Sequence, residues 1–304
     1  MGTAPLAQPS LEALLASPEF EVAAVATQPD RPKGRDLRLQ PSAVKQTALK
    51  AGLPVLQPLK ARDGAFIDQL RALAPDLIVV AAYGQILPPT ILELPHFGCL
   101  NVHTSLLPKY RGAAPIQWAI LDGEAETGVT IMKMDAGLDT GAILAQRATL
   151  IAPEDNAATL HDRLAGLGAA LLTETIPLCV AGGIQPQPQD NSRATYARKI
   201  TKEDGRLDWT QPARVLWNRV RGLTPWPGTF THLEGRLLKI WRASVVPEPR
   251  GAPGEVLLAD KSGVVVACGE QALRLEELQR EGGRRMSAAE FLAGHALAVG
   301  AQFQ

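Results

Sequence analysis

Asn101 and His103 are separated by one residue at the end of a short apolar run. In a β-strand, residues i and i+2 project from the same face, so the amide and the imidazole would lie side by side. Both groups can donate hydrogen bonds to a developing negative oxygen, which suits the pair to stabilising an oxyanion. The alternative is that His103 bonds the backbone of the loop that begins at Ser105–Pro108.

Two aspartates, Asp135 and Asp139, follow another apolar run within the segment Met134–Gly141. Two glycines and two aspartates over these eight residues predict a tight loop. One carboxylate could orient a neighbouring imidazole and favour its charged form. The alternative is that the aspartates stabilise the loop through Asx turns, and this role suits Asp135 better than Asp139.

The elements that must position these residues alternate along the first half of the chain. Apolar runs predict strands at Phe20–Ala26, Leu77–Ala82, Cys99–His103, Val129–Met134 and Ile143–Leu150. Periodic stretches predict helices at Ser10–Leu15, Ser42–Ala51, Ala65–Ala74, Ala113–Leu121 and Asn156–Val180. This alternation indicates an α/β fold with a parallel sheet, whose active site would lie at the carboxyl ends of the strands.

The second half follows a different pattern. The segment Ile184–Arg193 is rich in Pro, Gln and Asn, and we interpret it as an interdomain linker. A helix is predicted at Ala213–Leu223, and Ser287–Glu290 is a capping box that begins a final helix. Short strands that together favour a small barrel are predicted at Thr229–Leu233, Arg236–Val246, Gly254–Leu258, Gly263–Cys268 and Ala272–Leu278. We therefore place a catalytic domain at 1–183, a linker at 184–200 and a C-terminal domain at 201–304.

The composition, 46% hydrophobic and 20% charged, is that of a soluble globular protein. The longest apolar runs are strand-sized, well short of the roughly 20 residues of a membrane span, and the N-terminus lacks the pattern of a secretion signal. The three cysteines, Cys99, Cys179 and Cys268, are too few and too far apart for a disulfide framework or a cysteine-based zinc site. These features predict a protein of a reducing compartment.

Charge is distributed unevenly, although the net charge is zero. Residues 1–183 carry 14 basic and 18 acidic side chains, whereas residues 184–304 carry 17 and 13. The basic second half favours an anionic partner, and ordinary surface charge is the alternative. The sequence contains no GxGxxG, GxxxxGK[ST], HExxH or GxSxG pattern, so it supports no nucleotide-binding loop, no zincin motif and no nucleophile elbow.

Several motifs resemble the methionyl-tRNA formyltransferase family of folate-dependent enzymes. In the first half they are Thr27–Arg35, Gly98–Pro108, Arg111–Gln117, Glu126–Met132 and Gly137–Gly141. In the second half they are Tyr196–Ile200, Lys202-Glu203, Asp208-Trp209 and Pro225–Pro227. Folate-dependent formyltransferases share the Asn, His and Asp set, whereas the RGAAPIQ run and the C-terminal half favour the tRNA enzymes. The resemblance covers nearly the whole chain.

The resemblance implies a Rossmann-like formyltransferase domain with a mostly parallel sheet, followed by a small OB-like β-barrel domain. It implies an enzyme that transfers the formyl group of 10-formyltetrahydrofolate to the α-amino group of methionyl initiator tRNA, for translation initiation. The folate is a co-substrate, the tRNA is the partner, and neither a metal nor a membrane is expected. We expect a monomer in the cytoplasm.

The resemblance also assigns residues to sites. Asn101, His103 and Asp139 form the expected catalytic set. The expected folate site contains Ser105, Leu106, Leu107, Pro108, Tyr83, Gly84, Leu87, Leu138 and Thr140. The expected tRNA contacts are Arg31, Lys33, Arg35, Arg38, Lys199, Lys202 and Arg206.

Composition alone adds to the expected tRNA surface. The loop Asp30–Leu39 is basic, as a phosphate-contacting loop would be, and a solvated surface loop is the alternative. Further positive charge in the second half comes from Arg214, Arg219, Arg221, Arg236, Lys239 and Arg242. The tryptophans Trp209, Trp217, Trp226 and Trp241 are expected in the core rather than as platforms for base stacking.

The chain departs from the family at its start. The family begins with a strand that leads into Gly-Thr-Pro-x-Phe-Ala, whereas this sequence opens directly at Met1–Ala7. We therefore expect the first strand to be absent, which would leave its two neighbours without ladder partners. An assigned start that is too late explains the departure, and a protein that begins at Met1 is expected to be less stable and less active.

Three other functions fit parts of the sequence. A formyltransferase that acts on a sugar nucleotide amine or on glycinamide ribonucleotide would share the catalytic residues. A formyl-folate hydrolase would use water in place of the amine. A non-catalytic RNA-binding protein on a degenerate domain would account for the missing strand, but not for the intact Asn101, His103 and Asp139.

Overall fold

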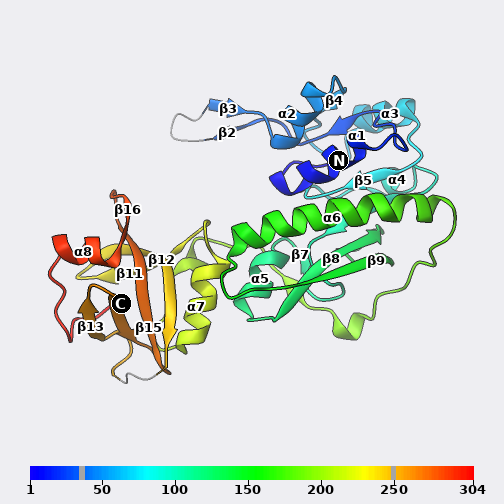
Figure 1. Ribbon diagram of the computed structural model, residues 1–304. Coiled ribbons are helices and arrows are strands. Elements are labelled where there is room, and N and C mark those ends of the chain that lie inside the picture. The colour runs from blue at the N-terminus through cyan, green and yellow to red at the C-terminus, as the bar shows by residue number, and fades with distance from the viewer. Residues whose placement is uncertain (34–37, 248–250) are drawn as a thin grey trace. The chain divides into compact units, whose positions relative to one another are not determined.

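The protein is described by a computed structural model at residues 1–33, 38–247 and 251–304 (Figure 1). It forms two compact units. Unit 1 contains Met1–Pro115, Thr127–Thr149 and His161–Ala197. Unit 2 contains Ile116–Glu126, Leu150–Leu160 and Arg198–Gln304. Each unit is thus built from segments that lie far apart in the sequence.

The main sheet of unit 1 has the strand order β5-β6-β8-β9. Its strands are β5 (Ile78–Val80), β6 (Cys99–His103), β8 (Glu126–Lys133) and β9 (Ile143–Leu150). β6 pairs in parallel with β5 and antiparallel with β8, and all of its residues are buried. Its apolar residues Cys99, Leu100 and Val102 and its polar residues Asn101 and His103 are thus all shielded from solvent. A separate parallel pair joins β1 (Val25–Ala26) to β4 (Val55–Leu56). The predicted parallel sheet is therefore mixed, because β8 runs antiparallel to β6.

The helices of unit 1 begin and end at local signals. They are α1 (Gln8–Ala16), α2 (Ala43–Lys50), α3 (Gly64–Leu73), α4 (Pro89–Leu92) and α6 (Ala157–Val180), with a 3₁₀ turn η1 at Pro5–Ala7. Ser42 caps α2 by accepting a hydrogen bond from the Lys45 N–H. After α6, Gly182 adopts a φ of +70°, and its N–H bonds the carbonyl of Cys179. A glycine in the left-handed conformation thus follows the helix, as is common at helix ends.

The α6 helix is long and apolar enough to cross a membrane by length and composition. At its midpoint, Gly168 lies against the sheet, since a Cβ there would come within 2.8 Å of Val102 on β6 and 3.4 Å of Val129 on β8. Its leucines Leu160, Leu164 and Leu172 are fully buried. We therefore interpret α6 as the core helix of unit 1.

Met1 and Gly2 lie between β1 and β5, where the first strand is expected. The Gly2 N–H donates to the Ala26 carbonyl at 2.9 Å, and Gly2 forms a parallel bridge with Ala81. The Met1 amino group donates to the Val79 carbonyl at 2.6 Å. A cavity of about 820 Å³ beside these two residues is lined by both Val22–Ala26 and Ile78-Val79. Met1 and Gly2 thus contact both neighbouring strands.

Unit 2 is built on an antiparallel sheet that packs against two helices. The strand order is β11-β12-β15-β14-β13, with β16 paired to β15. Its elements are α7 (Ala213–Gly222), β11 (Thr229–Leu233), β12 (Arg236–Val246), β13 (Val256–Asp260), β14 (Gly263–Ala267), β15 (Ala272–Arg280), β16 (Arg285–Ser287) and α8 (Ala288–Gly294). The predicted capping box at Ser287 and Glu290 is confirmed.

In the part of the chain that the structure describes, the two edge strands of the unit 2 sheet, β11 and β13, do not pair with each other, so the sheet is not closed. The C-terminal residues nevertheless bridge both of its edges. Phe303 pairs with Leu233 on β11, and Gln302 pairs with Glu255 next to β13. The core between the sheet and the helices includes Leu216, Ile240 and Leu273 among other buried apolar residues. The expected barrel therefore has its strands and its core but no closed sheet.

Several elements differ from the sequence predictions. The strand predicted at Phe20–Ala26 is limited to Val25–Ala26, because ladder partners exist only near its end. The short helix α5 (Pro115–Leu121) begins two residues later than predicted. Elements that were not predicted are the hairpin of β2 (Arg31–Lys33) and β3 (Arg38–Gln40), the parallel pair of β7 (Arg111–Gly112) and β10 (Tyr196–Ala197), the strands β4 and β16, the helix α4, and the 3₁₀ turns η1, η2 (Asn191–Arg193) and η3 (Glu203–Gly205).

Candidate functional site

β6 carries Asn101 and His103 on one face, as the period-two argument predicts. Asn101 lies opposite Val80 on β5, and His103 lies opposite Thr130 on β8. The two side chains are largely buried, with exposed fractions of 9% for Asn101 and 6% for His103. A buried imidazole and a buried amide both need polar partners, because an unpaired polar group in the interior is costly.

The loop after β8 supplies those partners through Asp139. The Asp139 carboxylate is 3.4 Å from Asn101 Nδ2 through Oδ1 and 3.7 Å from His103 Nδ1 through Oδ2. Oδ2 also accepts a 2.8 Å hydrogen bond from the Gly112 N–H. The structure therefore brings the three predicted catalytic residues together, although Asp139 follows Asn101 by 38 residues.

Both ring nitrogens of His103 face oxygen acceptors. Nε2 is 2.9 Å from the carbonyl oxygen of Tyr110, and Nδ1 faces the Asp139 carboxylate. A carbonyl oxygen can only accept, so Nε2 must carry a proton. The bond to Tyr110 is the loop-backbone contact that the sequence left open as the alternative for His103, and Nδ1 lies 3.7 Å from the carboxylate, beyond hydrogen-bond distance.

Asp135 has the structural role that the sequence left open for it. Its Oδ1 accepts hydrogen bonds from the Gly137 N–H at 3.0 Å and from Thr140 Oγ1 at 2.6 Å. These are contacts within an Asx-type turn. Asp139, by contrast, turns its carboxylate toward β6 and adopts a φ of +53° to do so. The two aspartates thus stabilise the loop and complete the site, respectively.

The predicted folate residues Ser105–Pro108 form a tightly bonded loop after β6. The Thr130 hydroxyl donates to the Ser105 carbonyl at 2.7 Å and accepts from the Leu107 N–H at 3.1 Å. Gln146 Nε2 donates to the Leu107 carbonyl at 2.9 Å. Side chains of β8 and β9 therefore bond this loop on its backbone.

The other predicted folate residues do not share one environment. Tyr83 and Leu87 are buried in the core formed with α3 and β5. Burial raises the pKa of Tyr83 to about 12, and its hydroxyl has no hydrogen-bond partner among the described residues. Leu138, on the Asp139 loop, is 59% exposed. Gly84 has a φ of +77°, which suits glycine, and Thr140 bonds Asp135.

The segment that we predicted as a basic loop, Asp30–Leu39, contains strand β2 and most of strand β3 in its described part. Arg31 is exposed and donates to Gln28 Oε1 at 2.6 Å. The backbone of Lys33 lies opposite that of Arg38 in the hairpin. Arg35 lies outside the described residues. Asp30 is engaged elsewhere, because Lys45 contacts its carboxylate at 2.7 Å and this hydrogen bond lowers the pKa of Asp30. The acidic residue at the base of the hairpin therefore already has a cationic partner.

The basic residues of unit 2 fall into two groups. Lys199, Lys202 and Arg206 are exposed. Arg221 is engaged instead: it donates to the carbonyls of Ala152 and Asp155 and stacks on a tryptophan ring at 3.7 Å. Burial lowers the pKa of Arg221. Arg221, which we expected among the tRNA contacts, therefore stabilises unit 2.

The tryptophans are likewise divided. Trp209 is buried and donates through Nε1 to Thr231 Oγ1 at 2.9 Å, as expected of a core residue. Trp226 is 53% exposed, so the expectation that it lies in the core is wrong. Its position explains the exposure, because Trp226 lies in the turn that joins α7 to β11 and not in a helix or strand with a buried face.

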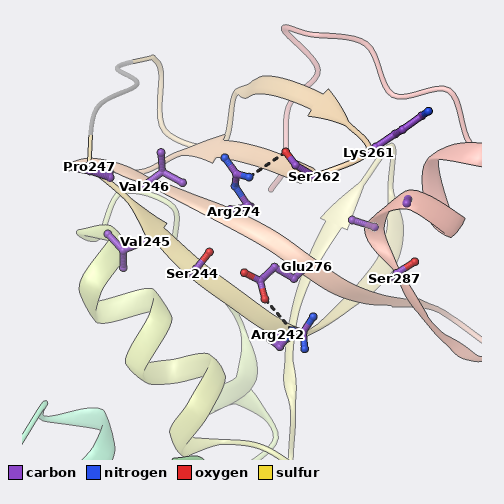
Figure 2. Close-up of a pocket in the computed structure, with 12 residues that line it drawn as sticks. Arg242, Ser244, Val245, Val246, Pro247, Lys261, Ser262, Arg274, Glu276 and Ser287 are labelled. Atoms are coloured by element: carbon purple, nitrogen blue, oxygen red, sulfur yellow. Dashed lines mark hydrogen bonds and ion pairs between the residues drawn. The ribbon is translucent and has the colours of Figure 1, made fainter. Parts of the chain in front are cut away.

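A cavity of about 610 Å³ lies on the sheet of unit 2 (Figure 2). Arg242 projects from β12, Arg274 from β15 and Lys261 from the β13–β14 turn. Glu276 pairs with Arg242 at 2.7 Å, while Arg274 donates to Ser262. The lining carries more positive than negative charge.

Two backbone groups of the site were missed from the sequence, the Tyr110 carbonyl and the Gly112 N–H. Backbone roles leave little trace in residue types. Gly112 does carry a signal: it adopts a φ of +111°, and a Cβ there would lie 2.8 Å from the Ala197 carbonyl oxygen. Glycine at this position therefore allows both the close approach of β10 and the bond to Asp139. Among the described residues, no group of three or more His, Cys, Asp or Glu side chains could hold a metal.

The fold and the site define a formyltransferase. Residues 1–176 match the formyl transferase family, and residues 199–296 match the formyl transferase C-terminal domain. The chain belongs to the formyl transferase family. It is 51% identical over 300 residues to the methionyl-tRNA formyltransferase of Geobacter sulfurreducens, covering 99% of this chain and 94% of that protein. It is 50% identical to the enzyme of that name from Caldanaerobacter subterraneus, covering 99% and 97%.

Solved structures share the fold at low sequence identity. The sugar 3N-formyl transferase WlaRD matches with a TM-score of 0.67 and 19% identity, covering 90% of this chain and 95% of that chain. HypX from Aquifex aeolicus, in complex with tetrahydrofolic acid, matches with a TM-score of 0.60 and 19% identity, covering 88% and 46%. These likenesses support the Rossmann-like, mixed α/β fold of unit 1.

Proposed function

We propose that this protein transfers the formyl group of 10-formyltetrahydrofolate to the α-amino group of methionyl initiator tRNA. The observation that carries the proposal is the meeting of Asn101, His103 and Asp139 at the end of β6. Two donors beside one carboxylate suit the transfer of an acyl group to an amine. The relatives named methionyl-tRNA formyltransferase, at about half identity over nearly the whole chain, support tRNA as the acceptor.

In the proposed reaction, the amino group of the methionyl ester attacks the formyl carbon and forms a tetrahedral oxyanion. Asn101 Nδ2 donates a hydrogen bond to this oxygen, typically worth about 3–4 kcal/mol. The protonated His103 donates through Nδ1, which gives up its 3.7 Å contact with Asp139, while Nε2 keeps its bond to the Tyr110 carbonyl. As the intermediate collapses, the C–N bond to N10 of the folate breaks and the C–N bond to methionine remains. The proton lost by the amine passes to N10, with Asp139 as the relay through water.

We place the folate beside the Ser105–Pro108 loop and the Asp139 loop. The first loop is held by Thr130 and Gln146, so it offers a preformed wall. Leu138 is exposed on the second loop and is available to contact a pteridine or benzoyl ring. Tyr83 and Leu87 then support this site from the core, and Gly84 allows the turn between them.

We propose that unit 2 acts as an OB-like barrel that binds the tRNA, with the β2–β3 hairpin as a second contact. Lys199, Lys202 and Arg206 are exposed and would track phosphates. Arg31 is exposed on the hairpin. We expect the enzyme to act as a monomer in the cytoplasm, where aminoacylated tRNA is used.

The test is a panel of acceptors with labelled 10-formyltetrahydrofolate. The panel contains methionyl initiator tRNA, methionyl elongator tRNA, glycinamide ribonucleotide, a nucleotide-linked amino sugar and buffer alone. We expect formylation of methionyl initiator tRNA and little release of formate in buffer. Formylation of the amino sugar or of glycinamide ribonucleotide would contradict the proposed acceptor, and formate release in buffer alone would indicate a hydrolase.

A further inference from the structure

Gln189 connects a buried arginine to the loop that carries Asp139. Its Nε2 donates to the carbonyl oxygens of Asp139 at 2.8 Å and of Gly141 at 2.7 Å. Its Oε1 accepts from Nε of Arg111 at 3.0 Å and from Nη2 of Arg111 at 2.7 Å. The amide nitrogen thus has an acceptor for each hydrogen, and the oxygen has a donor for each lone pair.

Arg111 fixes which end of the Gln189 amide faces the loop. A flipped amide would place its NH₂ against the guanidinium and its oxygen against two carbonyl oxygens, so the flipped state has no favourable contact. The Arg111 side chain is 2% exposed, and its Nη2 also donates to Asn191 Oδ1 at 2.8 Å. A charged donor at one end of the amide also polarises it, which strengthens the bonds at the other end.

The Asp139 loop needs such a contact because of its backbone. Asp139 adopts a φ of +53°, a left-handed conformation that residues other than glycine rarely occupy. If its carbonyl were released, the backbone could relax and swing the carboxylate away from His103 and Asn101. The bond from Gln189 to that carbonyl opposes this relaxation at the residue where it would occur.

Three successive residues serve the same site. The Tyr110 carbonyl faces the His103 ring, the Arg111 side chain holds Gln189, and the Gly112 N–H bonds the Asp139 carboxylate. This stretch is itself anchored by the segment after Gln189, since the Arg111 N–H donates to the Thr195 carbonyl at 2.9 Å. Both sides of the catalytic set therefore depend on residues 189–197.

We propose that Gln189 is a positioning residue for formyl transfer, which holds Asp139 in its left-handed conformation, and that Arg111 fixes Gln189 in turn. The inference rests on the proposed function, because it gives Asp139 a place in that reaction. It assigns a catalytic support role to a residue of the Ile184–Arg193 segment, whose composition we interpreted as that of a linker.

The first test compares Gln189→Ala and Gln189→Glu with a matched control, Gln187→Ala. Gln187 is an exposed glutamine in the same segment, and its hydrogen bonds among the described residues come from its backbone. We expect both Gln189 variants to lower kcat by about 10- to 100-fold, with KM for either substrate changed by less than about threefold. The control should match the wild type.

Gln189→Glu distinguishes positioning from simple packing. The carboxylate keeps the contact with Arg111 and nearly the same volume, but it has no hydrogen to donate to the Asp139 and Gly141 carbonyls. We expect it to be at least as impaired as Gln189→Ala. Full activity of Gln189→Glu would overturn the proposal, because the donation to the loop would then be dispensable.

A double-mutant cycle tests whether Gln189 acts through Asp139. In an Asp139→Ala background, Gln189→Ala should change the single-turnover rate by less than about twofold, since the residue to be positioned is gone. An equal fold-loss in both backgrounds would overturn the proposal, because a general structural defect would act independently of Asp139.

A second measurement does not depend on turnover. Hydrogen exchange of the amides in residues 134–141 should become about tenfold faster in Gln189→Ala and stay unchanged in Gln187→Ala. Unchanged exchange in Gln189→Ala would overturn the proposal. A wild type that formylates no tRNA would instead contradict the proposed function, while the exchange result would still decide whether Gln189 holds the loop.

Discussion

His103 has an oxygen acceptor at each of its two ring nitrogens. Its ring lies between the Tyr110 carbonyl and the Asp139 carboxylate, two groups that accept hydrogen bonds and cannot donate them. Asn101, two residues earlier, is the neutral donor on the same face. Asn101 Nδ2 has a second hydrogen for an oxyanion, whereas His103 must exchange its 3.7 Å contact with Asp139 for one with the oxyanion.

At this scale we predict the effect of Asn101→Ala. The variant loses one oxyanion donor and leaves the backbone of β6 intact, so kcat should fall by about 100- to 1000-fold. KM for methionyl initiator tRNA should change by less than about threefold, since the tRNA is held elsewhere. Steady-state kinetics with each substrate varied in turn provide the measurement. A loss confined to tRNA affinity, with kcat intact, would contradict the assigned role.

At the scale of elements, the sequence predicted those helices and strands whose formation depends on residues close together in the chain. β6, α6 and the capping box of α8 could be predicted, because apolar runs, periodicity and caps act over a few residues. The extent of β1 could not, because strand length depends on partners elsewhere. The contacts of Gln189 could not be predicted either, because Gln189 lies 78 positions from Arg111 and 50 positions from Asp139 in the sequence. Long-range pairs of this kind leave no pattern in a single sequence.

The N-terminal element leads to a prediction about pH. Burial lowers the pKa of the Met1 amino group to about 6, from 8.0 in an exposed terminus. Between pH 6 and pH 8 the unfolded chain therefore binds a proton that the folded chain has released, and the free energy of unfolding should rise with pH through this window. A pKa lowered from 8.0 to about 6 corresponds to at most about 2.7 kcal/mol of this dependence.

Urea unfolding at pH 6, 7 and 8 measures this dependence, on protein whose intact mass shows that Met1 is retained. As the control, the chain is extended before Met1 by five residues rich in Val and Ile, which moves the charge away from the site. These residues should enter the cavity beside Gly2 and raise stability by about 2 kcal/mol or more. A Gly/Ser extension of equal length should not. Equal stability of both extended proteins would contradict the prediction that the apolar extension packs into the cavity.

At the scale of the whole molecule, charge separates the two halves of the sequence. The second half has the excess of basic residues, and Lys199, Lys202 and Arg206 are exposed there. Further positive charge surrounds the cavity on the unit 2 sheet (Figure 2). Positive charge that contacts phosphates releases counterions, so binding should weaken as salt rises.

We therefore predict that removing exposed cations of unit 2 lowers the salt dependence of tRNA binding. In a Lys199→Ala, Lys202→Ala variant, the slope of log affinity against log salt should decrease by about one for each phosphate that the variant no longer neutralises. Lys50→Ala, an exposed lysine at the end of α2, is the control and should not change the slope. Filter binding between 50 and about 200 mM salt covers the range in which such an effect is measurable. An unchanged slope in the double variant would place the tRNA elsewhere.

The most direct test of the account is the single-turnover rate of formylation of methionyl initiator tRNA by three proteins. They are the wild type, His103→Ala and His161→Ala, in which His161 is a histidine of unit 1 that also pairs with an aspartate, Asp162. We predict formylation by the wild type, an equal rate for His161→Ala, and a rate about 100- to 1000-fold lower for His103→Ala. A wild type that leaves the tRNA unformylated, or a His103→Ala variant as fast as the wild type, would contradict the account.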